Sequence, residues 1–130
     1  MRQITPSKKR ELDNKLVKAY DYINRGDYSS ALELLNYILD YLDVPEIYLT
    51  KSVVLMRLGR YREALNTLDL AESYADQFGS TMFSRDNLWE NRGSAYLNLG
   101  DVNKARDCFN IALRYNPNSA FAKEGLKMCK

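Results

Sequence analysis

Histidine is absent from this sequence of 130 residues, and cysteine occurs only at Cys108 and Cys129, without metal-ligand spacing. We therefore expect no metal site and no cofactor, because structural zinc is held by closely spaced Cys and His residues. The sequence also has no Gly-rich phosphate loop and no nucleophile elbow, so we expect no enzyme activity. Both cysteines are expected to be reduced and partly buried, as in a cytoplasmic protein.

Long apolar runs are missing as well. No stretch approaches the roughly 18 apolar residues of a membrane span, and the polar start at residues 1–10 predicts no leader peptide. The 19 basic and 17 acidic residues are interspersed and give a net charge of +2. The short basic run from Lys8 to Arg10 is interpreted as a solvated helix face, with a phosphate-contacting or nuclear-targeting cluster as the alternative. We expect no nucleic-acid partner and no membrane insertion.

Proline and glycine are scarce, with three and six residues respectively. This scarcity favours long helices, because each proline or glycine inside a helix costs about 3 or 1 kcal/mol relative to alanine. Three similar turns begin at Gly26, Gly59 and Gly100, separated by 33 and then 41 residues. Both spacings are in the range of helical-hairpin repeats, and Asp27 and Asp101 can cap the helices that follow.

Apolar residues recur at helical spacing on both sides of each turn. Upstream examples are Leu16, Ala19, Tyr20 and Ile23, then Val53 and Met56, then Leu88, Trp89, Tyr96 and Leu97. Downstream examples are Ala31, Leu35 and Ile38, then Ala64, Leu68 and Ala71, then Ala105, Phe109 and Ala112. The pattern predicts a helix, a tight turn and a helix, three times over, and no strand.

The third of these units carries a recognisable set of spaced residues: Trp89, Gly93, Tyr96, Gly100, Ala105, Phe109, Ala112 and Pro117. They match every usual position of the tetratricopeptide-repeat (TPR) signature, so the chain resembles that family. The second unit fits with conservative replacements such as Tyr48 and Ser52, whereas the first has Lys15 where the aromatic residue should stand. That departure is typical of an N-terminal repeat without an outer neighbour.

The resemblance implies an all-α fold, a TPR-type α-solenoid of antiparallel helix pairs with about seven helices in a right-handed superhelix. We expect a single domain, 1–130, with repeats at about 12–45, 46–79 and 80–118 and a capping helix at 119–130. The longer second spacing is attributed to a second helix of unit two that continues to Phe78 and a first helix of unit three that starts early, after Gly79 and Ser80. Tyr74, Phe78 and Phe83 would then pack this protruding hairpin or form a lip that contacts a partner.

The resemblance also places a concave groove on residues ten, six and three positions before each turn glycine, which share one helix face. They are Leu16, Tyr20, Ile23, Leu49, Val53, Met56, Glu90, Ser94 and Leu97. Lys51, Arg57 and Asn91 are expected at the groove rim. Because most of these positions are apolar, the groove is expected to receive a ligand, to pair with a second copy, or to close on its own side chains.

The predicted function is a protein-protein interaction module: an adaptor, scaffold or client-holding chaperone that binds an apolar peptide or helix of another protein in the groove. The alternative is a self-associating structural module whose groove or capping helix forms a homo-oligomer.

Two further patterns refine this hypothesis. TPR proteins that bind the C-terminal carboxylate of heat-shock chaperones use a clamp of two lysines, two asparagines and one arginine. None of the corresponding positions here holds the residue type that the clamp has at that position, so we do not expect that role; they are Leu16, Tyr20, Thr50, Asn87 and Asn91. Lys18, Lys51 and Arg92 recur eight residues before each turn glycine and are interpreted as snorkelling side chains, with contact to an acidic partner as the alternative.

Overall fold

The computed structural model describes residues 3–130 and contains, within them, seven α-helices and no strand. The helices are α1 (Pro6–Asn24), α2 (Tyr28–Leu39), α3 (Pro45–Arg57), α4 (Tyr61–Phe78), α5 (Arg85–Asn98), α6 (Val102–Tyr115) and α7 (Ala120–Met128). Met1 and Arg2, part of the polar start for which no leader peptide is expected, lie outside the described residues. The all-α prediction and the helix number are confirmed.

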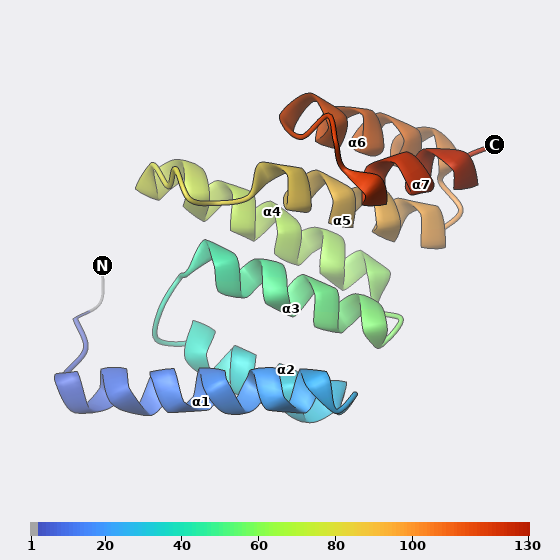
Figure 1. Ribbon diagram of the computed structural model, residues 1–130. Helices are drawn as coiled ribbons and strands as arrows, with labels where there is room; N and C mark the ends of the chain where they lie inside the picture. The colour runs from blue at the N-terminus through green and yellow to red at the C-terminus, as the bar shows by residue number, and fades with distance from the viewer. Residues whose placement is uncertain (1–2) are drawn as a thin grey trace.

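The helices form three hairpins, α1 with α2, α3 with α4 and α5 with α6, which we call units one, two and three (Figure 1). Gly26, Gly59 and Gly100 lie between the paired helices with φ of 79°, 76° and 86°, a left-handed conformation that other residues rarely adopt. Asp27 and Asp101 then cap α2 and α6 by accepting hydrogen bonds from Ser30 N and Lys104 N. The periodic glycines are therefore the hairpin turns, as predicted.

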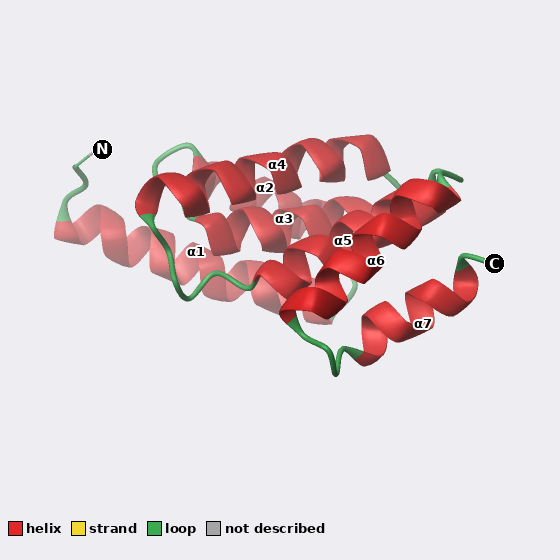
Figure 2. Ribbon diagram, turned by 90° about the horizontal axis from the view of Figure 1, so that it is seen from above, coloured by secondary structure: helices red, strands yellow, loops and turns green. Residues whose placement is uncertain are grey.

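Both ends of the array begin their helices as the sequence indicates. Pro6 occupies the first turn of α1, and Thr5 Oγ1 accepts a hydrogen bond from Lys8 N at 3.0 Å. At the other end, Ser119 Oγ accepts one from Ala122 N at 3.0 Å and starts α7. This last helix packs on α5 and α6 and covers unit three (Figure 2).

The junction between units two and three differs in part from the prediction. Helix α4 does continue to Phe78, where Gly79 ends it in the left-handed conformation. Helix α5 does not start early, however, because residues 80–84 form a bent connection and the helix begins only at Arg85. Phe83 is buried within this connection, and Ser84, in an extended conformation, is the residue before the helix. The extra residues of the second spacing therefore form a loop as well as a longer α4.

The aromatic residues at this junction pack mainly against the protein itself. Tyr74 stacks on Tyr48 with ring centroids 5.4 Å apart and on Phe78 at 5.8 Å. Phe83 joins the core cluster of units one and two, while Phe78 remains 45% exposed at the end of α4. Packing of the extended hairpin thus accounts for Tyr74 and Phe83.

The interior is built from small residues that let the paired helices approach closely. Ala19 and Ser52 on first helices and Ala31, Ala64 and Ala105 on second helices are fully buried. Larger side chains fill the spaces between them in two clusters, one through units one and two and one around Phe109 in unit three. The first helices are left with one face that is not covered by their hairpin partners, and the candidate site lies there.

Candidate functional site

The nine predicted groove residues lie on the first helices of the three hairpins, α1, α3 and α5. Leu16, Ile23, Leu49 and Met56 are partly buried and pack against the core of units one and two. Tyr20 is 45% exposed, and its hydroxyl lies 3.4 Å from Thr50 Oγ1 on α3. Some of the apolar surface expected in the groove is therefore used within the fold, while the rest faces outward.

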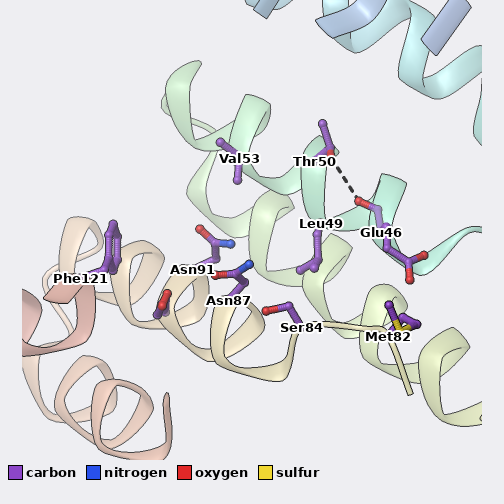
Figure 3. A pocket seen from close by; sticks show the side chains of 10 residues that line it. Glu46, Leu49, Thr50, Val53, Met82, Ser84, Asn87, Asn91 and Phe121 are labelled. Atoms are coloured by element: carbon purple, nitrogen blue, oxygen red, sulfur yellow. Dashed lines mark hydrogen bonds between the residues drawn. The ribbon is translucent and has the colours of Figure 1, made fainter. Parts of the chain in front are cut away.

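A cavity of about 490 Å³ lies between α3 and α5 (Figure 3). Leu49 and Val53 of α3 face Asn87 and Asn91 of α5 across it, and Phe121 of α7 stands at one end (Figure 3). The remaining lining residues are Glu46, Thr50, Met82, Ser84 and Glu90. This cavity brings together three of the predicted groove residues, Leu49, Val53 and Glu90.

Two neighbouring cavities extend this surface. One, of about 400 Å³, shares Val53, Asn91 and Phe121 with the first and adds Met56, Arg57 and Ser94 among its lining. The other, of about 390 Å³, shares Ser94 and Phe121 with the 400 Å³ cavity and adds Leu97 and Met128. We call this continuous surface, lined by α3, α5 and α7 with the connection before α5, the α3–α5–α7 groove.

Phe121 lines all three cavities and is absent from the residues predicted from the sequence. It is 51% exposed, and Met128 on the same helix is 67% exposed. From the sequence, this helix is expected to cover the last repeat or, in the alternative, to take part in a homo-oligomer, and not to line the groove. The signal that could have identified Phe121 is its place near the start of a first-type helix, where it aligns with Glu46 and Asn87 in the preceding units.

Glu90 is a carboxylate in an enclosed environment. The residue is 9% exposed, and Ser119 Oγ donates a hydrogen bond to Glu90 Oε1 at 3.1 Å. Burial raises the pKa of Glu90, the hydrogen bond from Ser119 opposes that shift, and the charge of Asp86 adds to it. Glu90 therefore joins the groove wall to the start of α7, and its charge is held in an unfavourable place.

The three predicted rim residues have different surroundings. Asn91 lies inside the groove and Arg57 is exposed at its edge. Lys51 is half-buried and lines none of the three cavities, so the prediction that it lies on the groove rim is not supported by this geometry. Burial lowers the pKa of Lys51, and the nearby Arg60 adds to this effect while Glu63 and Asp40 oppose it.

Arg92 is buried, which contradicts the prediction that its charge snorkels into water. Its side chain is 8% exposed, and Arg92 Nη2 donates to Asp69 Oδ1 at 2.8 Å and to Glu72 Oε1 at 2.9 Å. The guanidinium also lies over the ring of Trp89, 4.6 Å from its centroid. Arg92 thus joins α5 to α4 on the side away from the groove, because two carboxylates of the preceding unit face it.

Three of the five chaperone-clamp positions, Thr50, Asn87 and Asn91, line the α3–α5 cavity, and none of the five is basic. Cys108 and Cys129 are buried and unpaired, and burial raises the pKa of Cys108 to about 11. Across residues 3–130, no group of three His, Cys, Asp or Glu side chains could hold a metal ion. None of the described helices is both long enough and apolar enough to cross a membrane.

The comparisons with known proteins agree with this architecture. Tetratricopeptide-repeat family models match residues 16–78 and 87–119. A TPR repeat-containing protein of Methanocaldococcus jannaschii is 27% identical over 118 residues, which cover 85% of this chain and 19% of that relative. The chain therefore spans only a small part of the relative's length.

Solved TPR structures superpose on nearly the whole chain. The first TPR of Spaghetti (RPAP3), bound to the HSP90 peptide SRMEEVD, has a TM-score of 0.80 at 19% identity and covers 92% of this chain and 90% of its own. The Arabidopsis OM64 TPR domain has a TM-score of 0.81 at 15% identity and covers 93% and 95% respectively. At such identities the likeness establishes the fold.

Proposed function

This chain belongs to the tetratricopeptide-repeat family, and from that premise we propose that it is a protein-interaction module that binds an apolar segment of another protein in the α3–α5–α7 groove. The observation that carries the proposal is the set of three adjoining cavities with Val53, Leu97 and Phe121 among their linings. An apolar surface that stays open to solvent between polar side chains is typical of a binding site. We propose no catalytic role.

The groove chemistry supports an apolar client rather than an acidic chaperone tail. The Spaghetti TPR is bound to a peptide that ends in Glu-Glu-Val-Asp, which carries several negative charges. In this chain, the clamp positions hold Leu16, Tyr20, Thr50, Asn87 and Asn91, and none can neutralise a carboxylate. Burial of apolar side chains against Leu49, Val53 and Phe121 is the stronger source of affinity here.

The test is capture of partners from the native host with the wild type and with Val53→Glu, followed by mass spectrometry. Val53 lines two of the cavities, so a charge there should weaken groove binding and remove the groove partners from the capture. Leu70→Glu is the matched control, since Leu70 is exposed on α4 and lines none of the three cavities. If both variants capture the same proteins as the wild type, the groove is not the binding site.

Self-association is a second candidate, favoured by the exposed Phe121 and Met128 on α7. A second copy could cover these side chains and the 390 Å³ cavity beside them. Light scattering as a function of concentration distinguishes the two proposals. A monomer at high concentration that is stabilised by an apolar peptide contradicts self-association, whereas a stable dimer that Val53→Glu dissociates contradicts the client proposal.

A further inference from the structure

The charged residues that line the α3–α5 cavity are both acidic. Glu46 and Glu90 are the charged residues of its lining, and neither lysine nor arginine is among the residues that line it. Asp86 lies close enough to raise the pKa of Glu90, while hydrogen bonding from Ser84, with a smaller contribution from Asn116, outweighs the effect of burial and lowers the pKa of Asp86 itself. A segment bound in this cavity therefore meets negative side-chain charges and no positive one among the residues of the lining.

The carboxylate of Glu46 is available for a partner. Glu46 is exposed in the first turn of α3, and among residues 3–130 its carboxylate makes neither a hydrogen bond nor an ion pair. Arg85, the basic residue that precedes Asp86, is already paired with Asp76 at 2.6 Å and lies 4.0 Å from Glu72. Among residues 3–130, no lysine or arginine therefore lines this cavity.

Two amides line the same cavity. Asn87 and Asn91 are one helical turn apart on α5 and point into the cavity (Figure 3). Each side chain offers hydrogen-bond donors and an acceptor, which suits the N–H and C=O groups of a peptide backbone. Leu49 and Val53 on the opposite wall provide the apolar contact. The cavity therefore combines apolar side chains, two uncharged amides and two carboxylates.

From this arrangement we infer that the preferred occupant is an apolar peptide segment carrying a lysine or arginine, whose charge lies against Glu46 while Asn87 and Asn91 contact its backbone. The inference rests on the proposed function, which it makes specific. It requires the opposite charge preference to that of a clamp for an acidic tail. Because Glu46 is exposed, its contribution should be modest and dependent on salt.

The experiment uses three synthetic fluorescein-labelled peptides that share one apolar core and carry Lys, Gln or Glu at the same two flanking positions. Fluorescence anisotropy measures their affinity for the full chain. At low ionic strength we expect the Lys peptide to bind about threefold to tenfold more tightly than the Glu peptide, with the Gln peptide between them. Added salt should reduce this preference in the wild type.

Glu46→Gln should remove most of the preference, and Glu46→Lys should reverse it. Glu33→Gln is the matched control: it removes the same charge from an exposed position on α2 that lines none of the three cavities. Far-UV circular dichroism verifies that each variant is folded, and the salt titration of the wild type tests the inference without any substitution.

The outcomes distinguish a failure of the proposed function from a failure of the charge inference. If no peptide binds, the proposed function fails. If all three bind equally, or the Glu peptide binds best, the groove binds apolar segments and the charge inference is wrong. A preference for Lys that persists in Glu46→Gln, or disappears equally in Glu33→Gln, also overturns it.

Discussion

Units two and three have the same hairpin geometry but different side chains at equivalent positions. Where unit two has Leu49, Lys51 and Ser52 on its first helix, unit three has Glu90, Arg92 and Gly93. On the second helix, Leu68 of unit two corresponds to Phe109 of unit three. Each of the three first-helix residues of unit three contacts a particular neighbour. Replacing Gly93, Arg92 and Glu90 one at a time tests these contacts.

Gly93 and Phe109 form the most closely packed of these pairs. A Cβ atom at Gly93 would lie 2.6 Å from Phe109 Cε1, and one at Gly125 would lie 2.5 Å from Phe109 Cζ. The large ring of unit three is therefore accommodated by two glycines on α5 and α7. The corresponding residues of unit two, Ser52 and Leu68, are both fully buried, so a side chain at this helix position is compatible with the smaller leucine.

The largest effect is expected from Gly93→Ser, which introduces the residue of unit two. Overpacking against Phe109 should reduce the free energy of unfolding by about 1–3 kcal/mol, which exceeds the roughly 0.5 kcal/mol gained in helix propensity. Urea denaturation measures the change. In a double-mutant cycle, Gly93→Ser with Phe109→Leu should lose less than the sum of the single losses. Additive losses would contradict direct contact as the cause.

Arg92→Met should have the next largest effect. It removes the hydrogen bonds to Asp69 and Glu72 and the contact with Trp89. The loss in unfolding free energy should be about 1–2 kcal/mol, less than for a fully buried pair, because Asp69 is 71% exposed and stays hydrated. Arg92→Lys, the residue of unit two, should give an intermediate loss, since lysine lacks the planar fork. An Arg92→Met variant as stable as the wild type would contradict this prediction.

Much of the fold follows from local sequence signals, and the exceptions have a common cause. The turn glycines, the small buried residues and the extension of α4 to Phe78 could be predicted because each depends on neighbours within the same unit. The start of α5 could not, because it depends on Phe83 turning into the core of units one and two. The position of Arg92 likewise depends on carboxylates 20 and 23 residues away in the preceding unit.

The same limit applies to the candidate site. Repeat positions identify Leu49, Val53 and Leu97 as groove residues, because the spacing relative to a turn glycine determines the face of a helix. Phe121 belongs to the groove because α7 packs beside α5, and the repeat pattern identifies it only when the numbering is extended past unit three. Lys51 lines none of the three cavities, so its place on the groove rim stays a prediction.

Lys51→Met should have a small effect of the opposite sign to Arg92→Met. Lys51 is half-buried without an ion-pair partner among residues 3–130, and burial lowers its pKa. The charged form is disfavoured in the folded protein, so methionine should be neutral or stabilising by up to about 0.5 kcal/mol at pH 7. The free energy of unfolding of the wild type should increase as the pH rises through the lowered pKa of Lys51 toward 10.5. The difference in stability between the wild type and Lys51→Met should therefore shrink. Urea denaturation at matched pH values measures this difference, and a destabilised variant at pH 7 would show that the ammonium has a partner.

The smallest effect is expected from Glu90→Gln, which tests the carboxylate that replaces Leu49 of unit two. Burial raises the pKa of Glu90 above its ordinary value of 4.5, so the folded state holds this proton more tightly than the unfolded state. Stability from this group is therefore present at low pH and is lost as the pH rises through the raised pKa. Glutamine keeps an acceptor for Ser119 Oγ without the charge, so the variant should have the higher Tm at pH 7.

The pH profile of the difference in Tm between Glu90→Gln and the wild type is the more specific measurement. The advantage of Glu90→Gln should disappear as the pH falls below 4.5, where the wild-type carboxyl is protonated in both states. An advantage that is independent of pH would point to packing instead of charge. If the stabilised variant also loses the preference for the Lys peptide, the unfavourable charge of Glu90 is retained for binding, since functional sites commonly reduce stability.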